Sequence, residues 1–301
     1  MVDGSSLSKM KIFILGHEGY IGRGLMDYFA HKYQVIGWDK KEDLFQLSTG
    51  FLVREKIDVL VNLSLMADRS SAKYQIDTAG DHVNVEGARH LARILRGTKI
   101  KWLQFSTREV LGPVYTKKDV KKTKWGYRPK FLVDETQPLK PINPYGKSKV
   151  MAEIISESHP YSNIIRLTTG YTDHDQPGGW VIQLARAVCN DKQVKLSNGG
   201  DQFRDPVHTN DIACLIEKIS EKEIYGEVFH AGGGSKNLIS LREFVTIIDP
   251  KVKIEKTEGG DLGFAFNIEK ANKLTGWMPQ VCIRKKALQL ANIIKKAKTE
   301  S

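Results

Sequence analysis

Tyr145 and Lys149 are the residues whose types and spacing point most directly to chemistry. They lie four positions apart in the segment NPYGKSK, so they share one face of a predicted helix over 144–158. A lysine ammonium beside a phenol favours the phenolate, which can accept the proton of a substrate hydroxyl. Because such pairs also occur by chance in helices, this interpretation needs support from the rest of the chain.

A glycine-rich turn supplies that support. Gly16, Gly19 and Gly22 lie between a predicted strand over 11–15 and a predicted helix over 20–30. Glycines at this spacing allow a tight turn, close approach of the backbone to a pyrophosphate and packing of the helix on the sheet, and the phosphates rest on the N–H groups of the helix N-terminus. The turn therefore predicts a bound dinucleotide that takes a hydride while Tyr145 takes the proton.

Asp39 bears on which dinucleotide is bound. It ends the next predicted strand, over 34–38, where a carboxylate accepts hydrogen bonds from the adenosine ribose hydroxyls and repels a 2′-phosphate. This favours NAD over NADP, although Lys40 and Lys41 follow directly and weaken the preference. The alternative interpretation is that Asp39 only caps the turn.

Further apolar runs predict strands over 57–65, 101–106 and 164–167, and a helix over 83–95. Strands that alternate with helices predict an α/β fold with a Rossmann-type doubly wound parallel sheet. We predict a nucleotide-binding domain over 1–167 with a return segment near 205–235. Residues 168–301, where Gly and Pro become frequent, are predicted to form mainly a smaller C-terminal α/β substrate domain. The longest irregular stretch, 113–143, is a candidate lid or binding loop.

A hydroxyl group follows the predicted strand over 101–106. Ligands bind at the carboxyl ends of such strands, so a hydroxyl of Ser106 or Thr107 could bridge a substrate oxygen and Tyr145. The alternative is that both residues only shape the turn.

Composition and charge limit the location, the partners and the metal sites that we expect for this chain. The chain has 301 residues, no apolar run long enough to span a bilayer, and a polar start, so we expect a cytoplasmic protein without a membrane partner. The net charge of +11 suits anionic substrates or nucleic acid. A cluster of Lys and Arg over 117–130 is more simply a solvated loop face, and we do not expect a nucleic-acid partner. The spacing of Cys189, Cys214 and Cys282 fits no metal site.

The chain resembles the extended short-chain dehydrogenase/reductase family, and within it the NAD-dependent epimerase/dehydratase group. The matching segments are GHEGYIG, VNVEGARHLARIL, STREVLG, DETQPLKPINPYGKSKVMAE, IIRL, GGDQFRDPVHTNDIA and NIEKANKLTGWMPQ. The resemblance implies a tightly held NAD, a nucleotide-diphosphate sugar as substrate, and a homodimer. It also implies that Tyr145 is the base and that Lys149 binds the nicotinamide ribose. Thr107 would orient the substrate hydroxyl, and Arg204 would bind a substrate phosphate. By the same resemblance, the cofactor is also contacted by Tyr20, Ile21, Asp43, Leu44, Leu63 and Ser64.

Departures from the family pattern limit which reactions this chain is expected to catalyse. Sugar dehydratases of this group carry Thr-Asp-Glu where this chain has Thr107, Arg108 and Glu109, and a guanidinium cannot donate the proton. Glu109 remains a candidate second acid or base, and Arg108 could face a carboxylated substrate. Thr169 stands where a substrate-binding asparagine is usual, and Glu258 where a second phosphate-clamping arginine is usual.

These residues together predict an epimerase. It would oxidise a carbinol of a nucleotide sugar, most often at C4, and then reduce the ketone from the other face. A dehydratase or a keto-sugar reductase of the same family is the alternative. A non-catalytic NAD(P)-binding sensor or scaffold is a further alternative, but such proteins commonly lack the tyrosine or the lysine, and this chain has both.

Overall fold

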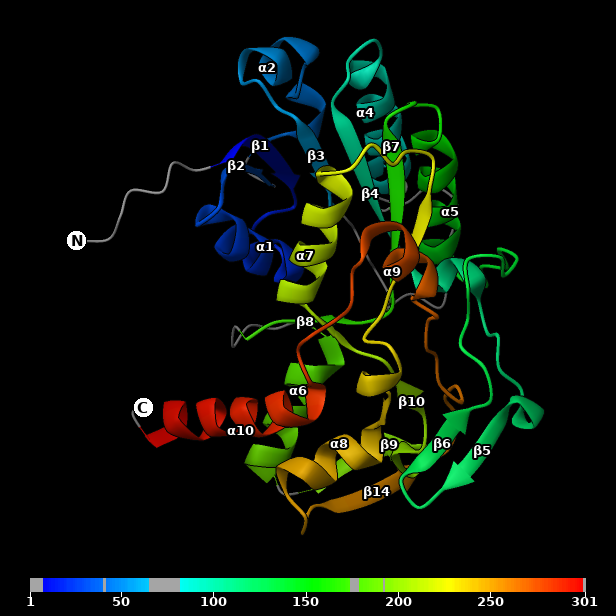
Figure 1. Ribbon diagram of the computed structural model, residues 1–301. Helices are drawn as coiled ribbons and strands as arrows, with labels where there is room; N and C mark the ends of the chain where they lie inside the picture. The colour runs from blue at the N-terminus through cyan, green and yellow to red at the C-terminus, as the bar shows by residue number, and fades with distance from the viewer. Residues whose placement is uncertain (1–7, 40–41, 65–81, 174–178, 192, 300–301) are drawn as a thin grey trace. The chain divides into compact units, whose positions relative to one another are not determined.

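The computed structural model describes residues 8–39, 42–64, 82–173, 179–191 and 193–299, and these form two compact units (Figure 1). The first unit takes in the chain up to Gly112, then Pro138–Leu167 and Ala213–Phe229. The second takes in Pro113–Gln137, Thr168–Ile212 and the chain from His230 onward. The second unit thus includes 113–137, a stretch that the sequence analysis assigns to the first domain. The functional roles given to the two parts stay predictions.

The first unit is built on a six-stranded sheet with the strand order β12-β7-β4-β3-β1-β2. Its strands are β1 (Ser8–Leu15), β2 (Tyr33–Trp38), β3 (Val59–Asn62), β4 (Lys101–Thr107), β7 (Ser162–Leu167) and β12 (Val228–Ala231). The pairs β1–β2, β1–β3, β3–β4 and β4–β7 are all parallel. The strand order reverses between β1 and β3, which is where doubly wound sheets bind their ligands. The predicted Rossmann-type sheet is confirmed.

Helices cover both faces of this sheet (Figure 1). On one face, α2 (Thr49–Arg54), α4 (Gly87–Leu95) and α5 (Pro144–Ser156) contribute to a buried apolar cluster with residues of β1, β3 and β4. On the other face, α1 (Tyr20–Ala30) lies beside α7 (Thr209–Ser220), where the Tyr28 and Tyr33 hydroxyls donate to Glu217 at 3.0 and 2.8 Å. A sheet covered in this way buries both faces of its strands, which explains the unbroken apolar runs in the sequence.

The strands and helices predicted for this unit are observed, but several boundaries differ: β1 begins at Ser8 rather than at residue 11, β7 begins at Ser162 rather than at 164, and α5 ends at Ser156 rather than at 158. Helix α2 was not predicted. The strand predicted over 57–65 is only Val59–Asn62, because the chain turns at Ser64, whose N–H donates to Asn62 Oδ1 at 3.1 Å. Leu65 lies outside the described residues. The helix predicted over 83–95 opens with a wide turn, η2 (His82–Glu86), before α4 begins.

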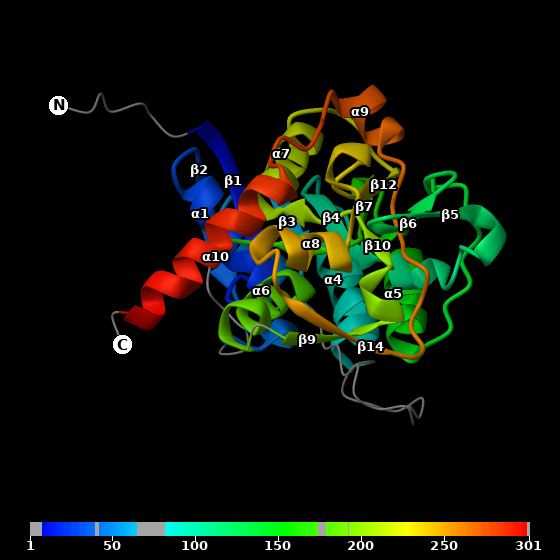
Figure 2. The same cartoon turned by 90° about the horizontal axis from the view of Figure 1, so that it is seen from below.

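The second unit contains short strand pairs and helices. Its pairs join β5 (Val120–Thr123) to β6 (Gly126–Pro129), β8 (Gly170–Tyr171) to β11 (Val207–His208), β9 (Gln193–Ser197) to β14 (Lys253–Thr257), and β10 (Phe203–Arg204) to β13 (Ile239–Ser240). The helices are α6 (Gly179–Asp191), α8 (Leu241–Ile248), α9 (Glu269–Thr275) and α10 (Ile283–Thr299), and α6 and α10 lie side by side in Figures 1 and 2. The short helical turns of this unit are η4 (Lys117–Asp119), η5 (Asn198–Gly200) and η6 (Ser235–Asn237), whereas η1 (Leu44–Gln46) and η3 (Arg108–Leu111) belong to the first unit.

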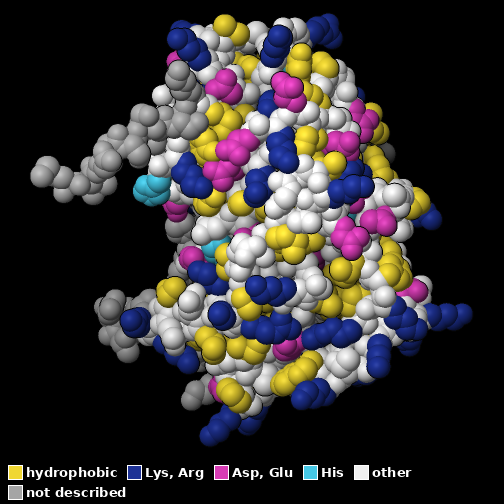
Figure 3. All heavy atoms as spheres, in the orientation of Figure 1, with side chains coloured by type: hydrophobic (Ala, Val, Ile, Leu, Met, Phe, Trp, Pro, Cys, Tyr) yellow, Lys and Arg dark blue, Asp and Glu magenta, His cyan; other side chains and the backbone are white. Residues whose placement is uncertain are grey.

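The stretch over 113–143 is not irregular throughout, which corrects the sequence-based expectation. Residues 120–129 form the β5–β6 hairpin, and Tyr127 N–H donates to the Asp201 carbonyl at 2.7 Å. Gly126 turns the chain with φ of +110° and lies against the Asp201 backbone, where a Cβ would come within 2.6 Å. The lysine-rich strands lack alternating apolar residues, so periodicity did not reveal them. Figure 3 shows basic side chains over the region that Figure 1 labels β5, β6 and β14.

Among the described residues, no helix is both long enough and apolar enough to cross a membrane.

Replacement of a core leucine tests the packing of α4 on the sheet. Leu91 is fully buried in the apolar cluster, so Leu91→Ala should lower the free energy of unfolding by about 2–5 kcal/mol in urea denaturation. Ile154, on α5, is 53% exposed, and Ile154→Ala should change it by less than about 0.5 kcal/mol. Equal effects of the two substitutions would contradict this packing.

Candidate functional site

The glycine-rich turn folds tightly against the end of β3. Gly16 has φ of +84°, and a Cβ on it would lie 3.1 Å from the Leu63 carbonyl carbon and the Ser64 nitrogen. Gly19 N–H donates to the Gly16 carbonyl at 3.1 Å, and a Cβ on Gly22 would come within 2.2 Å of the same oxygen. The turn therefore needs glycine for space as well as for torsion, and it brings Leu63 and Ser64 beside the start of α1 at the switch point of the sheet.

This arrangement fits a pyrophosphate. Helix α1 begins at Tyr20 without a side-chain cap, and Ile21 lies in the same first turn. Phosphate oxygens are the partners that N–H groups of an uncapped first turn suit. The structure thus gathers the predicted cofactor residues Gly16, Gly19, Tyr20, Ile21, Gly22, Leu63 and Ser64 at one edge of the sheet.

Asp39 lies beside this turn, at the end of β2. Its Oδ2 accepts the N–H of Glu18 at 2.8 Å, and its own N–H donates to Glu42 at 2.9 Å. The side chain therefore does hold the turn, as the alternative interpretation supposes, and its contact with a ribose stays a prediction. Lys40 and Lys41 lie outside the described residues.

The predicted adenine contact occupies the turn that follows. Asp43 caps η1 by accepting the N–H of Phe45 at 2.9 Å. The Leu44 side chain occupies space at α4, because a Cβ on Gly87 would come within 2.7 Å of it. The contact of these residues with adenine stays a prediction.

The catalytic candidates come from the end of β4 and the start of α5. Thr107, Tyr145 and Lys149 are buried, with 7, 7 and 4% of their surface exposed. Asn143 caps α5 by accepting the N–H of Gly146 at 2.7 Å, and its Nδ2 donates to Glu109 at 2.6 Å. The Glu109 carboxylate is therefore tied to the helix that carries Tyr145 and Lys149.

Close packing joins the same two segments. A Cβ on Gly146 would lie 2.6 Å from the Glu109 carbonyl oxygen, so only glycine permits this approach. Arg108 follows Thr107 directly in η3 and is half-buried. The structure thus brings Thr107, Arg108, Glu109, Tyr145 and Lys149 into one neighbourhood of the first unit.

Several supporting residues were not predicted from the sequence. Asn84 Nδ2 donates to Ser148 Oγ at 3.0 Å, and that hydroxyl donates to the Tyr145 carbonyl at 2.9 Å. The sequence shows only that they are polar residues in helices that are otherwise apolar on the buried face. This pattern does not indicate which groups they contact.

Burial controls the charge of Lys149. Loss of solvation lowers its pKa to about 8, and the nearby charge of Glu153 acts in the opposite direction. At neutral pH the side chain is therefore still mostly an ammonium, which is the form that stabilises a phenolate.

The predicted phosphate contacts belong to the second unit. Arg204 Nη2 lies 2.9 and 3.2 Å from the two carboxylate oxygens of Asp261, and its Nη1 donates to the Phe203 carbonyl at 2.8 Å. Thr169 Oγ1 accepts from Trp180 Nε1 at 3.4 Å. Arg204 is thus already paired with a carboxylate, and the phosphate contact of Arg204 and the substrate contact of Thr169 stay predictions.

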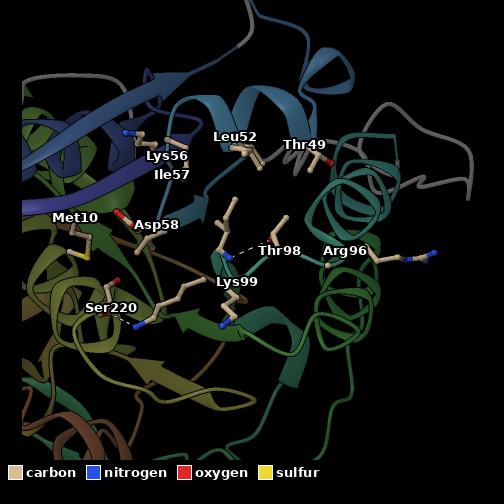
Figure 4. A pocket seen from close by; sticks show the side chains of 15 residues that line it. Met10, Thr49, Leu52, Lys56, Ile57, Asp58, Arg96, Thr98, Lys99 and Ser220 are labelled. Atoms are coloured by element: carbon tan, nitrogen blue, oxygen red, sulfur yellow. Dashed lines mark hydrogen bonds between the residues drawn. The ribbon is translucent and has the colours of Figure 1, made fainter.

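A depression of about 840 Å³ opens at the opposite end of the strands (Figure 4). Its lining includes Lys56 and Asp58 before β3 and Arg96 and Lys99 before β4. Ligands of doubly wound sheets bind at the carboxyl ends, and none of the residues that line this depression is a predicted site residue. It is therefore separate from the candidate site.

Comparison with known proteins identifies the family. The model of the NAD dependent epimerase/dehydratase family matches residues 12–232, which is more than half of the 301 residues. The chain belongs to the NAD-dependent epimerase/dehydratase family, as its sequence motifs predicted.

Relatives within the family differ in activity. The chain is 29% identical to a UDP-glucuronate 4-epimerase of Thermodesulfobacterium geofontis over 155 residues, which span 48% of this chain and only 47% of that enzyme. It is 23% identical to dTDP-glucose 4,6-dehydratase 1 of Escherichia coli, over 90% of this chain and 89% of that enzyme.

A solved structure agrees with the fold. A UDP-glucuronic acid 4-epimerase of Bacillus cereus, in complex with UDP-glucuronic acid and NAD, matches with a TM-score of 0.79 and 20% identity, over 96% of this chain and 100% of that one. At this identity the likeness establishes the fold.

Filling the glycine-rich turn should damage it. Gly22→Ala should lower the free energy of unfolding by about 1–3 kcal/mol, because its Cβ meets backbone atoms of Gly16 and His17 that cannot move cheaply. Gly50→Ala in α2 is the control, since nothing lies closer than 3.9 Å, and stability there should be unchanged or higher. A Gly22→Ala protein as stable as wild type in urea would contradict the tight turn.

The pKa of Lys149 predicts a pH dependence of stability. Its pKa is about 8 in the folded protein, against 10.5 for a freely solvated lysine side chain. Above pH 8 the unfolded state binds more protons, so stability gains up to about 1.4 kcal/mol per pH unit relative to Lys149→Met. Urea denaturation of both proteins between pH 7.5 and 10 measures this difference in stability. Parallel plots of stability against pH for the two proteins would contradict the lowered pKa of Lys149.

Proposed function

We propose that this protein is an NAD-dependent nucleotide-sugar epimerase. The observation that carries the proposal is the buried Tyr145–Lys149 pair on α5, tied through Asn143 and Glu109 to the strand end that carries Thr107. A base, a cation that stabilises its phenolate, and a hydroxyl that can orient a substrate oxygen are the groups that oxidation of a carbinol requires.

The residues of the first unit fit NAD. The N–H groups at the start of α1, which no side chain caps, suit a pyrophosphate, and the carboxylate of Asp39 at the end of β2 suits an unphosphorylated ribose. When bound, NAD supplies a hydride acceptor and later a hydride donor. Lys149 would hold the nicotinamide ribose while its charge acts on Tyr145.

Within this proposal each side chain has one task. Thr107 orients the substrate hydroxyl, and Tyr145 takes its proton at the phenol oxygen as the carbinol is oxidised. Lys149 stabilises the phenolate form of Tyr145, which is the form that accepts this proton. The ketone turns within the site, and Tyr145 returns the proton when the opposite face is reduced. Arg204 would contact a phosphate of the nucleotide sugar, and Thr169 would contact the substrate. We also propose a homodimer.

A dehydratase is the second candidate. Its specific support is Glu109, whose carboxylate is held 2.6 Å from Asn143 Nδ2 and is one residue from the position of the missing acid. Arg108 in that position cannot donate a proton at neutral pH, which favours the epimerase.

Arg108 also guides the choice of substrates to test. A half-buried cation next to Thr107 would favour a sugar that carries a carboxylate. Two relatives of this chain act on a glucuronic-acid nucleotide by name. Uronates therefore belong in the first panel.

A panel of nucleotide sugars, incubated with protein and NAD and followed by chromatography and mass spectrometry, tests the function. A product of unchanged mass and new retention supports the epimerase, and loss of water supports the dehydratase. Net consumption of added NADH with a keto-sugar would support a reductase. Retained NAD without turnover of any substrate would favour a non-catalytic role.

Tyr145→Phe should abolish most turnover. Loss of the phenol hydroxyl removes the proton acceptor, so the rate should fall at least about 100-fold while NAD affinity stays unchanged. Tyr225→Phe is the control, because that ring packs on Tyr161 outside the candidate site. Wild-type turnover by Tyr145→Phe would refute the assignment of the base.

A further inference from the structure

A buried carboxylate lies one helical turn beyond Lys149. Glu153 is 2% exposed, and both of its oxygens are engaged. Oε1 accepts from Ser106 Oγ and from Arg166 Nε at 3.0 Å, and Oε2 accepts from Arg166 Nη2 at 2.8 Å. The guanidinium therefore holds the carboxylate in the two-point geometry that is strongest for this pair.

The contacts of Glu153 join three elements at the candidate site. Glu153 belongs to α5, Ser106 to β4 and Arg166 to β7, and Ser106 lies opposite Arg166 in the register of the two strands. Ser106 directly precedes Thr107, whereas Glu153 follows Lys149 by four positions. A single carboxylate thus connects the strand end that carries Thr107 to the helix face that carries Lys149.

The same carboxylate is the charge that acts on Lys149. Among the residues whose side chains the structure describes, the charged or titratable groups on the elements packed against α5 are Lys101 of β4, Arg108 and Glu109 of η3, Arg166 of β7, and Glu86, Arg89, His90 and Arg93 of η2 and α4. Among these groups and Glu153, only Glu153 raises the pKa of Lys149 against the effect of burial.

We propose that Glu153 and Arg166 are positioning residues for the reaction, a role that rests on the proposed function. Their ion pair fixes Ser106, and through it Thr107, relative to α5, and it keeps a negative charge beside the Lys149 ammonium. Arg166 makes this possible, because an unpaired carboxylate would be costly to bury. Neither residue needs to touch the substrate.

Two variants separate this role from simple support of the fold. Glu153→Gln removes the charge but keeps an oxygen that can accept from Ser106. Glu153→Met/Arg166→Met removes the whole pair, and apolar replacement of a buried ion pair is often neutral for stability. Glu217→Gln is the matched control, because Glu217 also has three donors, Tyr28, Lys32 and Tyr33, but lies on α7.

The first measurement needs no substrate. NMR titration of the Lys149 side chain, assigned from the signal lost in Lys149→Arg, gives the midpoint of its deprotonation. Both Glu153 variants should lower this midpoint by about one pH unit or more, whereas Glu217→Gln should leave it unchanged. An unchanged midpoint in folded Glu153 variants would overturn the proposal, even if the protein turned over no sugar.

The second measurement uses the substrate found with the wild-type protein. Both Glu153 variants should lower kcat about 10- to 100-fold, with little change in KM, and should move the alkaline limb of the kcat profile to lower pH. A variant with a shifted Lys149 midpoint but the wild-type profile would show that the pair only supports the fold. Absence of turnover in the wild type would refute the proposed function, while the NMR titration would still decide whether Glu153 acts on Lys149.

Discussion

A parallel sheet that is buried on both faces confines polar chemistry to the ends of its strands. In this protein β1 and β3 carry unbroken apolar runs over 12–15 and 59–61, and polar residues are concentrated where these strands end. Gly16 and Ser64 follow the ends of β1 and β3, and Thr107 ends β4. The turn after Gly16 leads into α1, and the turn after Thr107, η3, packs against the start of α5. The glycine-rich turn and the strand end that carries Thr107 are therefore set by the same constraint, since both lie where the sheet stops being apolar.

Polar side chains that do lie inside the unit are paired across neighbouring strands. Asn62 donates to Gln104 at 2.8 Å, and these residues are opposite each other in the register of β3 and β4. Ser106 and Arg166 repeat this arrangement between β4 and β7, with Glu153 as their common acceptor. Buried polar groups that are paired in this way favour one arrangement of strands over others, so the pairs Asn62–Gln104 and Glu153–Arg166 help to define the strand register beneath α5.

Much of this fold could be predicted from the sequence, because its strands contain short apolar runs, its helices have apolar residues at helical spacing, and its glycines stand at a strand-to-helix junction. The α1 boundaries were predicted at Tyr20 and Ala30, as observed. The β5–β6 hairpin was missed, because its strands are stabilised by contacts with distant residues such as Asp201. Glu153 and Arg166 were missed for the same reason: thirteen positions separate them, and only the fold shows that they form a pair. Local pattern predicts elements, but not contacts made across them.

The pairing of Arg204 with Asp261 affects how an anion can bind to Arg204 in the second unit. A guanidinium that already holds a carboxylate at 2.9 Å can take up another anion only by exchange or by sharing. The affinity for an incoming group is then the difference between two ion pairs rather than the strength of one. A doubly charged group gains more from such an exchange than a singly charged one, because attraction scales with charge. The carboxylate of Asp261 would thus compete with an incoming anion for Arg204. An anion with too little charge would not displace it and would not stay bound.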